Sequence, residues 1–186
     1  MLTARYTDPV RIRVILSYGL VFCLAAAAIH GQSVAGLKWT APAGWKVEGS
    51  RPMRAATYTV PAVAGDAENA ECVVYFFGAG SGGSVEANME RWKSQILKAD
   101  GKPADAQIVK RTVHALPVTI IDSTGTYTGT GGPLAPGATV KAQYRMIGAV
   151  IENPDGNLFL KFTGPVKTVT QNQAKFDQLL QSFGKN

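Results

Sequence analysis

The first residues with a chemical pattern are glycines in the middle of the chain. Gly78, Gly80 and Gly83 give the spacing G-x-G-x-x-G between an apolar run, 71–77, and a segment that reads as a helix. In a dinucleotide-binding turn of this spacing, backbone N–H groups and the helix dipole hold a pyrophosphate. The chemistry that this pattern offers is therefore anion binding.

The surroundings of these glycines argue against a cofactor site. A dinucleotide-binding unit continues with a second parallel strand and an acidic residue about 20 residues further on. Here the helix is followed by Gly101-Lys102-Pro103 and by an alternating strand without a terminal acid. A tight turn that lets the helix pack closely on the strand explains the glycines better. A weaker anion contact is the alternative, and its candidate ligand-binding residues are Gly78, Gly80, Gly82, Gly83, Ser84 and Arg54.

Residues for catalysis or metal binding are few. After the first 31 residues the chain contains one histidine, His114, and one cysteine, Cys72. A metal site needs several clustered ligands, and no G-x-S-x-G pattern places a serine nucleophile. We therefore predict no catalytic residue, no metal and no cofactor. Cys72 lies in the apolar run, where a free thiol is usually buried, and His114 fits an ordinary strand-end histidine.

Aromatic and basic side chains offer a further hypothesis. The three tryptophans, Trp39, Trp45 and Trp92, flank predicted strands and a helix, a position typical of core packing. Two arginines, Arg54 and Arg145, lie on predicted strands and face either solvent or a cleft. A pocket that they share with Tyr58 or Tyr144 is the less favoured alternative.

A targeting segment is predicted at the N-terminus. Arg5, Arg11 and Arg13 precede an uncharged apolar run, 14–29, that ends in small residues. A basic start, a short apolar stretch and a small-residue exit are typical of a secretory signal peptide. The run is shorter than the about 20 residues that span a bilayer. We predict a cleaved signal peptide, 1–31, with an uncleaved membrane anchor as the alternative.

The remaining chain, 33–186, is predicted to be one domain that is periplasmic or secreted. Without the leader the net charge falls from +6 to +4, because the leader contains three arginines and one aspartate. The basic residues form no stripe and no known nucleic-acid-binding module, so we predict no nucleic-acid partner. Contact with a membrane is expected only through an uncleaved leader. With one cysteine left, the domain has no internal disulfide and depends on its hydrophobic core.

The residue pattern predicts an α+β fold. Alternation and β-branched or aromatic residues predict strands at 33–43, 53–60, 71–77, 106–114, 118–128, 140–152 and 157–162. Asn153-Pro154-Asp155-Gly156 is a strong turn signal, so the last two strands should form a hairpin. Helices are predicted at 85–98, with Ser84 as its cap, and at 166–183. The glycine- and proline-rich segment 129–138 should be an irregular loop, either a lid or a variable excursion. Short connections make the central sheet largely antiparallel, flanked by the helices.

Several motifs resemble a group of exported bacterial proteins of unknown function. They are Trp39-x-x-Pro42-x-Gly44-Trp45, Met53-Arg54-x-Ala56-x-Tyr58, Glu71-Cys72-x-Val74-Tyr75-Phe76-x-Gly78, Asn88-x-x-x-Trp92, Thr163-Gly164-Pro165 and Phe176-x-x-Leu179-Leu180-x-Ser182-Phe183. That group is similar to the PsbP-like and DcrB-like α/β/α sandwich fold, a central antiparallel sheet between helices. The resemblance covers nearly all of 33–186 and brings no catalytic residues. Relatives with this fold include a photosystem accessory subunit and a Ran-binding factor, so the resemblance implies a binding or accessory role.

The expected function is that of an exported, non-enzymatic binding or accessory domain with an unknown protein or small-molecule partner. The alternative is a small anion- or nucleotide-binding enzyme that uses the glycine-rich loop, 78–83, with Arg54 or His114 nearby. A structural subunit of an envelope complex is a third possibility. The fold alone does not distinguish among these functions.

Overall fold

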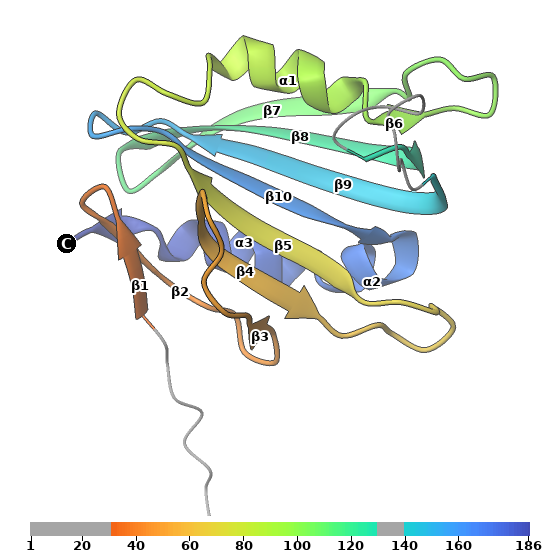
Figure 1. Cartoon of the computed structure of the whole chain (residues 1–186), viewed down its shortest axis with the longest axis horizontal. Coiled ribbons are helices and arrows are strands. Elements are labelled where there is room, and N and C mark those ends of the chain that lie inside the picture. Colours follow the sequence, from red (N-terminus) through yellow and green to blue (C-terminus); the bar gives the residue numbers. More distant parts are fainter. Residues whose placement is uncertain (1–30, 130–139) are drawn as a thin grey trace, which may run out of the picture.

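The computed structural model describes residues 31–129 and 140–186, and most of these residues belong to antiparallel β-sheets (Figure 1). The larger sheet has eight strands, in the order β3-β4-β5-β10-β9-β8-β6, with β7 also paired to β8. Its strands are β3 (Lys46–Val47), β4 (Arg54–Val60), β5 (Ala70–Phe76), β6 (Ile96–Leu97), β7 (Ala106–Val113), β8 (Leu116–Tyr127), β9 (Lys141–Ile151) and β10 (Leu158–Pro165). The smaller sheet contains β1 (Gly31–Val34), β2 (Leu37–Thr40) and β11 (Gly184–Lys185).

Within these two ranges, three short helices accompany the sheets: α1 (Val85–Lys93), α2 (Val166–Gln171) and α3 (Gln173–Ser182). Every strand pair of the described residues is antiparallel. The prediction of a largely antiparallel sheet accompanied by helices is therefore confirmed. Among these residues no helix is long and apolar enough to cross a membrane.

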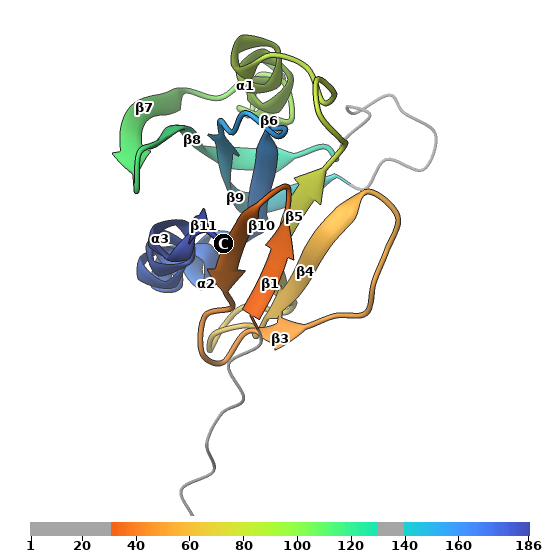
Figure 2. The same ribbon diagram turned by 90° about the vertical axis from the view of Figure 1, so that its left-hand side faces the viewer.

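The two faces of the larger sheet pack against different elements. Successive residues of a strand point to opposite faces. On β9, Ile147 and Ala149 join a main core with side chains from β2 and α3, whereas Met146 and Val150 join a smaller cluster with Met89 and Trp92 of α1. Figure 2 shows the larger sheet between α1 and the pair α2–α3. We call the two sides the main-core face and the α1 face.

Two tight turns were not predicted from the sequence. The segment 33–43, expected as one strand, is a hairpin of β1 and β2 that turns at Ala35 and Gly36, both with positive φ. The turn between β7 and β8 uses His114 and Ala115, with φ of 46° and 68°, so the chain reverses before Pro117 and not at it. Positive φ at both central residues matches the right-handed twist of a hairpin, but most residues other than glycine and asparagine avoid it.

The predicted helices are shorter than expected. The helix 85–98 ends at Lys93, and Ile96 belongs to β6, which pairs with β8. The helix 166–183 is divided at Asn172, whose side-chain amide donates to the carbonyl of Thr168. The Trp45 indole N–H donates to Oδ1 of the same asparagine at 3.1 Å, which fixes the break against the core.

β1 includes two residues, Gly31 and Gln32, that precede the predicted domain boundary at 33. Gly31 pairs with Thr40, and the Gln32 side chain accepts a hydrogen bond from the Trp39 indole at 3.1 Å. A leader that is removed before Gly31 keeps this strand intact. The signal peptide itself stays a prediction, because residues 1–30 lie outside the described part. Nearly all of the predicted 129–138 loop lies outside it as well.

Trp92 anchors α1 to the sheet. Its side chain is buried, and a Cβ placed on Gly148 of β9 would lie 2.4 Å from the indole ring. The ring therefore occupies the space that any other residue at 148 would need. This confirms the prediction that Trp92 packs in the core.

We expect Trp92→Ala to lower the free energy of unfolding by about 3–5 kcal/mol, the range for removing a large aromatic side chain from a core. Urea denaturation measures the loss. Glu90→Ala, two residues earlier on α1 and 71% exposed at its side chain, should change stability by less than about 0.5 kcal/mol. Equal losses in the two variants would show that Trp92 does not hold the helix.

Candidate functional site

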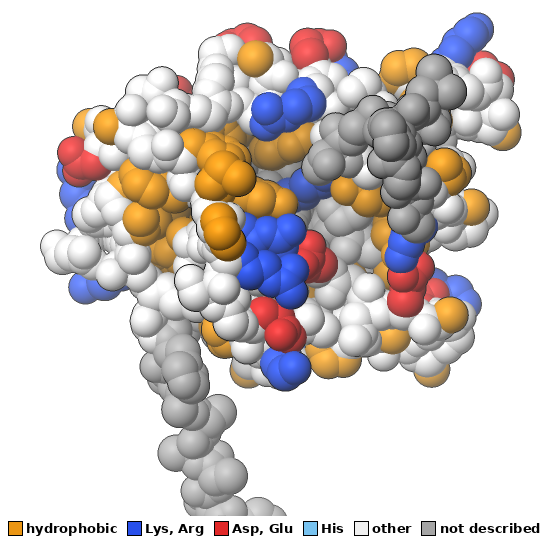
Figure 3. All heavy atoms as spheres, viewed as in Figure 1, with side chains coloured by type: hydrophobic (Ala, Val, Ile, Leu, Met, Phe, Trp, Pro, Cys, Tyr) orange, Lys and Arg blue, Asp and Glu red, His pale blue; other side chains and the backbone are white. Residues whose placement is uncertain are grey.

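The candidate site lies on the α1 face, on strands β5 and β10. These strands pair in register, so that residues of one face stand side by side: Phe159 opposite Tyr75, Lys161 opposite Val73, and Thr163 opposite Glu71. All six side chains line cavities on this face. The space-filling view in Figure 3 shows hydrophobic side chains next to a group of basic side chains on this side of the molecule.

Two adjoining cavities open here, and they share Tyr75 and Lys161. The aromatic cavity, of about 250 Å³, is lined by Tyr75, Phe77, Arg91, Trp92, Gln95, Phe159 and Lys161. The tyrosine cavity, of about 270 Å³, is lined by Arg54, Glu68, Asn69, Glu71, Val73, Tyr75, Tyr127, Lys141, Tyr144, Lys161 and Thr163. Each volume is close to the lower end, about 300 Å³, of known ligand pockets.

Lys161 is the polar group at the junction of the two cavities. Its side chain leaves the centre of β10, and the residue is only 7% exposed. The ammonium group donates hydrogen bonds to the Tyr127 hydroxyl at 2.9 Å and to Oε1 of Gln95. Burial, with the positive charge of Arg91 as a second cause, lowers the pKa of Lys161 from 10.5 to about 8.

Lys161 differs from Arg54 and Lys141, the other basic residues of the tyrosine cavity, because it has no acidic partner among the described residues. Arg54 forms an ion pair with Glu71 at 3.0 Å, and Lys141 forms one with Glu68. Among the described residues no carboxylate lies within ion-pair distance of Lys161. A buried charge without a counter-ion is costly, so it is unusual unless a function requires it.

Three tyrosines surround the lysine and keep their protons. Burial raises the pKa of Tyr75, and it raises the pKa of Tyr127 and of Tyr144 to about 12. Their hydroxyls are therefore hydrogen-bond donors at neutral pH. The rings of Tyr127 and Tyr144 stack at 5.9 Å, and the Lys161 ammonium lies 4.8 Å from the centre of the Tyr127 ring.

The glycine loop supports the aromatic cavity from outside. A Cβ on Gly82 would lie 2.5 Å from the ring of Phe159, which forms part of the cavity wall. The buried Asn88 amide donates to the carbonyls of Gly82 and Ser84, and Ser84 caps α1 by accepting from the Ala87 N–H. The loop thus holds the start of α1 close to the sheet, as the tight-turn interpretation predicted.

The predicted site residues are only partly brought together. Arg54 lines the tyrosine cavity, whereas Gly78, Gly80, Gly82, Gly83 and Ser84 line none of the cavities described here. The strand β5 before the loop pairs antiparallel with both its neighbours, so the described chain contains no parallel unit of the dinucleotide-binding kind. Anion binding at the loop stays a prediction.

The other singled-out residues have structural surroundings. Cys72 is a buried free thiol in the main core, and burial raises its pKa. His114 Nδ1 forms a 2.8 Å hydrogen bond with the Phe183 carbonyl, to which it donates. Arg54 and Tyr144 do line one cavity, but Tyr58 is buried in the main core. In the described ranges no three His, Cys, Asp or Glu side chains lie close enough to bind a metal together.

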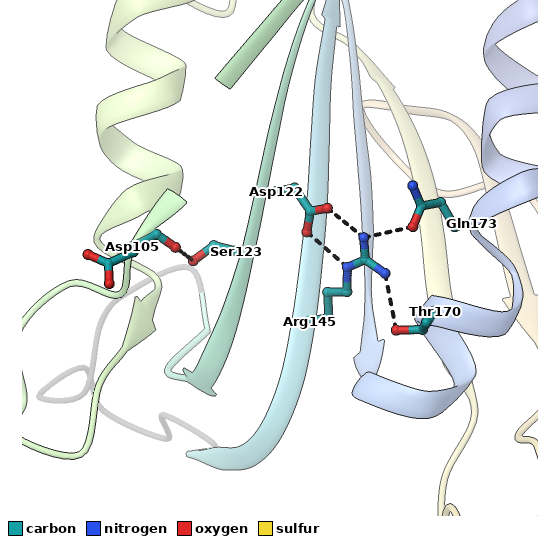
Figure 4. A network of polar contacts seen from close by, with 6 residues as sticks. All are labelled: Asp105, Asp122, Ser123, Arg145, Thr170 and Gln173. Carbon is teal, nitrogen blue, oxygen red and sulfur yellow. Dashed lines mark hydrogen bonds and ion pairs between the residues drawn. The ribbon is translucent and has the colours of Figure 1, made fainter. Parts of the chain in front are cut away.

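The largest of the four cavities among the described residues, of about 460 Å³, is a weaker candidate because its charges are paired. Figure 4 shows Arg145 of β9 donating to both carboxylate oxygens of Asp122, and also to Thr170 and Gln173. Lys98 pairs with Asp105 at 3.1 Å on another wall. These contacts attach α2 and α3 to the sheet and engage all three guanidinium nitrogens of Arg145 within the protein.

Comparison with known proteins bears on the fold. No family model matches the chain, and no curated protein matches it. The chain is similar to the solution structure of cyanobacterial PsbP from Synechocystis, with a TM-score of 0.50, 12% identity, and coverage of 91% of this chain and 99% of that chain. The fold is PsbP-like. A Pseudomonas aeruginosa protein of unknown function is also similar, with a TM-score of 0.48, 11% identity, and coverage of 85% of this chain and 97% of that chain.

The sequence analysis missed Lys161, the centre of the PsbP-like domain's candidate site. The signal was present, because Lys161 interrupts the apolar run from Leu158 to Phe162. Strands buried on both faces are nearly continuous hydrophobic runs, so a lysine inside one marks either an exposed edge or a functional group. Because β10 lies between β5 and β9, it is not an edge strand, and Lys161 is therefore a candidate functional residue.

We expect Gly82→Ala to destabilise the protein more than Gly80→Ala. Both positions have positive φ, so both variants suffer similar backbone strain, but no atom lies within 4 Å of a Cβ at Gly80. The additional loss for Gly82→Ala should be about 1–3 kcal/mol, the usual cost of overpacking. Urea denaturation of the two variants gives the difference. Equal losses would mean that the loop does not press on Phe159.

The stability cost of the Lys161 charge should depend on pH. Because its folded pKa is near 8 and its unfolded pKa near 10.5, the unfolded chain binds more protons between these values, so stability rises with pH in this window. Lys161→Met removes this term. The free energy of unfolding of the variant minus that of the wild type should fall by about 2 kcal/mol from pH 7 to pH 9.5. Denaturation of both proteins at the two pH values measures this, and a constant difference would mean a normal lysine pKa.

Proposed function

We propose that this chain is an exported, non-enzymatic binding or accessory domain that holds a small organic ligand in the aromatic cavity. The observation that carries the proposal is the composition of that cavity: four aromatic side chains around a buried lysine. Ligand pockets are typically apolar with a small number of placed polar groups. The aromatic cavity has this composition.

The rings of the cavity wall hold one another in place before any ligand arrives. Tyr75 and Phe77 stack at 5.9 Å, and Phe77 meets Phe159 at 5.6 Å with a tilt of 52°. Phe77 is 36% exposed, an unusual position for a phenylalanine unless its ring meets another molecule. A preformed wall lowers the entropic cost of binding, which favours a ligand site over chance packing.

The position of the reactive side chains supports binding without catalysis. Neither Cys72 nor His114 lines the aromatic or the tyrosine cavity. The basic and acidic groups that do line them are mostly engaged in ion pairs. The cavities therefore offer recognition groups, and neither of the chain's described cysteine and histidine side chains stands beside them.

The scaffold that we propose is the complete PsbP-like sandwich, with α1 covering one face of the sheet and α2–α3 the other. In such a scaffold the main core provides stability, and the thinner α1 face is free to form the cavity. The predicted signal peptide supports export to the periplasm or out of the cell. The likeness to PsbP concerns the fold, so no partner of PsbP is transferred.

We expect the wild-type protein to bind members of a panel of small aromatic compounds, both neutral and anionic, and Phe77→Ala to weaken this binding about tenfold. Loss of one aromatic wall costs roughly 1–1.5 kcal/mol, which corresponds to that factor. Ligand-observed NMR detects the binders, and isothermal titration calorimetry measures their dissociation constants.

The matched control is Val109→Ala, which shortens an exposed hydrophobic side chain on β7. Val109 lines neither cavity, so its variant should bind as the wild type does. A panel without any binder, or binding that is insensitive to Phe77→Ala, would contradict the proposed function.

A further inference from the structure

We propose that the ligand of the aromatic cavity is a small organic carboxylate, whose head group lies between Lys161 and Arg91 and whose apolar body lies against Phe77, Trp92 and Phe159. This inference rests on the proposed function and names the chemical class of its ligand. Three observations carry it, namely the charges of the cavity, the free donors at its polar end, and the distribution of its apolar walls.

The charges that line the aromatic cavity have one sign. Lys161 and Arg91 are its two charged side chains, and no aspartate or glutamate is among its lining residues. Neither of the two forms an ion pair within the described part of the chain. Two cations that face one cavity repel each other, and an anion between them removes the repulsion and supplies the missing counter-ion.

The free hydrogen-bond donors match the two oxygens of a carboxylate. An ammonium group has three donors, and Lys161 uses two of them on Gln95 and Tyr127. Arg91 uses one guanidinium nitrogen on the side-chain oxygen of Asn88, and the rest of its planar fork is without a partner among the described residues. A guanidinium fork with an adjacent ammonium is well suited to a planar carboxylate.

The remaining walls require a ligand that is mostly apolar. Tyr75, Phe77, Trp92 and Phe159 contribute aromatic surface, and the polar groups stand beside them at the Lys161 end. Inorganic phosphate has no group to place against these rings. An aromatic or branched aliphatic carboxylate satisfies both parts of the cavity within its volume of about 250 Å³.

A matched pair of probes tests this inference: naphthoic acid and naphthalene methanol, which share the ring system and differ in the charge of the head group. Isothermal titration calorimetry at pH 7 gives both dissociation constants. The wild type should bind the acid at least about tenfold more tightly than the alcohol, because hydrogen bonds to charged groups contribute at least this factor. Inorganic phosphate, the third arm, should not bind.

Variants of two lysines locate the effect. In Lys161→Met the preference for the acid should disappear, while affinity for the alcohol stays the same. In Lys93→Met, which removes a lysine of α1 that is paired with Glu90 and lines neither cavity, the preference should remain. Arg91→Gln, on the exposed surface of α1, should reduce the preference without loss of folding, and it keeps the test decisive if Lys161→Met fails to fold.

The outcomes separate this inference from the function on which it rests. Equal binding of acid and alcohol by the wild type would overturn the carboxylate and leave the binding function standing. The same follows if the acid preference survives in Lys161→Met. If Lys161→Met fails to fold, survival of the preference in Arg91→Gln has this meaning. Binding of phosphate as tight as that of naphthoic acid would also overturn it. Absence of binding for both naphthalene probes and for the whole aromatic panel would overturn the proposed function and this inference together.

Discussion

The contact between the indole of Trp92 and the bare backbone of Gly148 sets the distance between α1 and the sheet. Any Cβ at position 148 would overlap the ring, so the helix approaches as closely as it does only because the strand has a glycine there. Gly148 is also the register partner of Lys161 on β10. The indole consequently stands beside the lysine and forms one wall of the aromatic cavity. A glycine weakens the middle of a strand, and here the burial of a tryptophan offsets that cost and shapes a site.

In the function that we propose, Lys161 brings stability and ligand binding into opposition. Its charge is buried next to Arg91 and lacks a carboxylate partner, and the lowered pKa records the cost of keeping it charged. A methionine would fill a similar volume without that cost, yet it would offer nothing to an anion. Selection for stability alone gives no reason to keep an unpaired buried charge, whereas binding sites often contain one. Two nearby basic residues do have acidic partners, in the ion pairs Arg54–Glu71 and Lys141–Glu68. Lys161 lacks such a partner on the same face of the sheet.

Local chemistry determined how much of this structure was predictable. The apolar run before the glycines became β5, and the Asn153–Gly156 turn joined β9 to β10, because each signal lies within a few residues. Burial of Cys72 and Trp92 followed from their apolar neighbours. The pairing of β5 with the distant β10 has no local signal, and this pairing is what brings Lys161 to Tyr75. The turn at His114 and Ala115 was missed because it lacks the glycine, asparagine or aspartate that usually marks a turn with positive φ. The early end of α1 was missed because Ile96 continues the helical spacing while it pairs with β8.

The glycine-rich loop and the cavity are therefore parts of one arrangement with different tasks. Four glycines with positive φ let the chain leave β5 and enter α1 within a few residues. The buried Asn88 side chain then donates hydrogen bonds to two carbonyls of the loop, so these acceptors point inward and are satisfied within the protein. A phosphate cradle needs the opposite polarity, with free N–H groups turned toward the ligand. In the function that we propose, side chains that the loop positions indirectly recognise the anion, through Phe159 beneath Gly82 and through the closeness of α1 to Lys161. In this PsbP-like fold the main core is filled by side chains of β2 and α3. The α1 face is thinner, and we propose that a single buried lysine there binds the ligand.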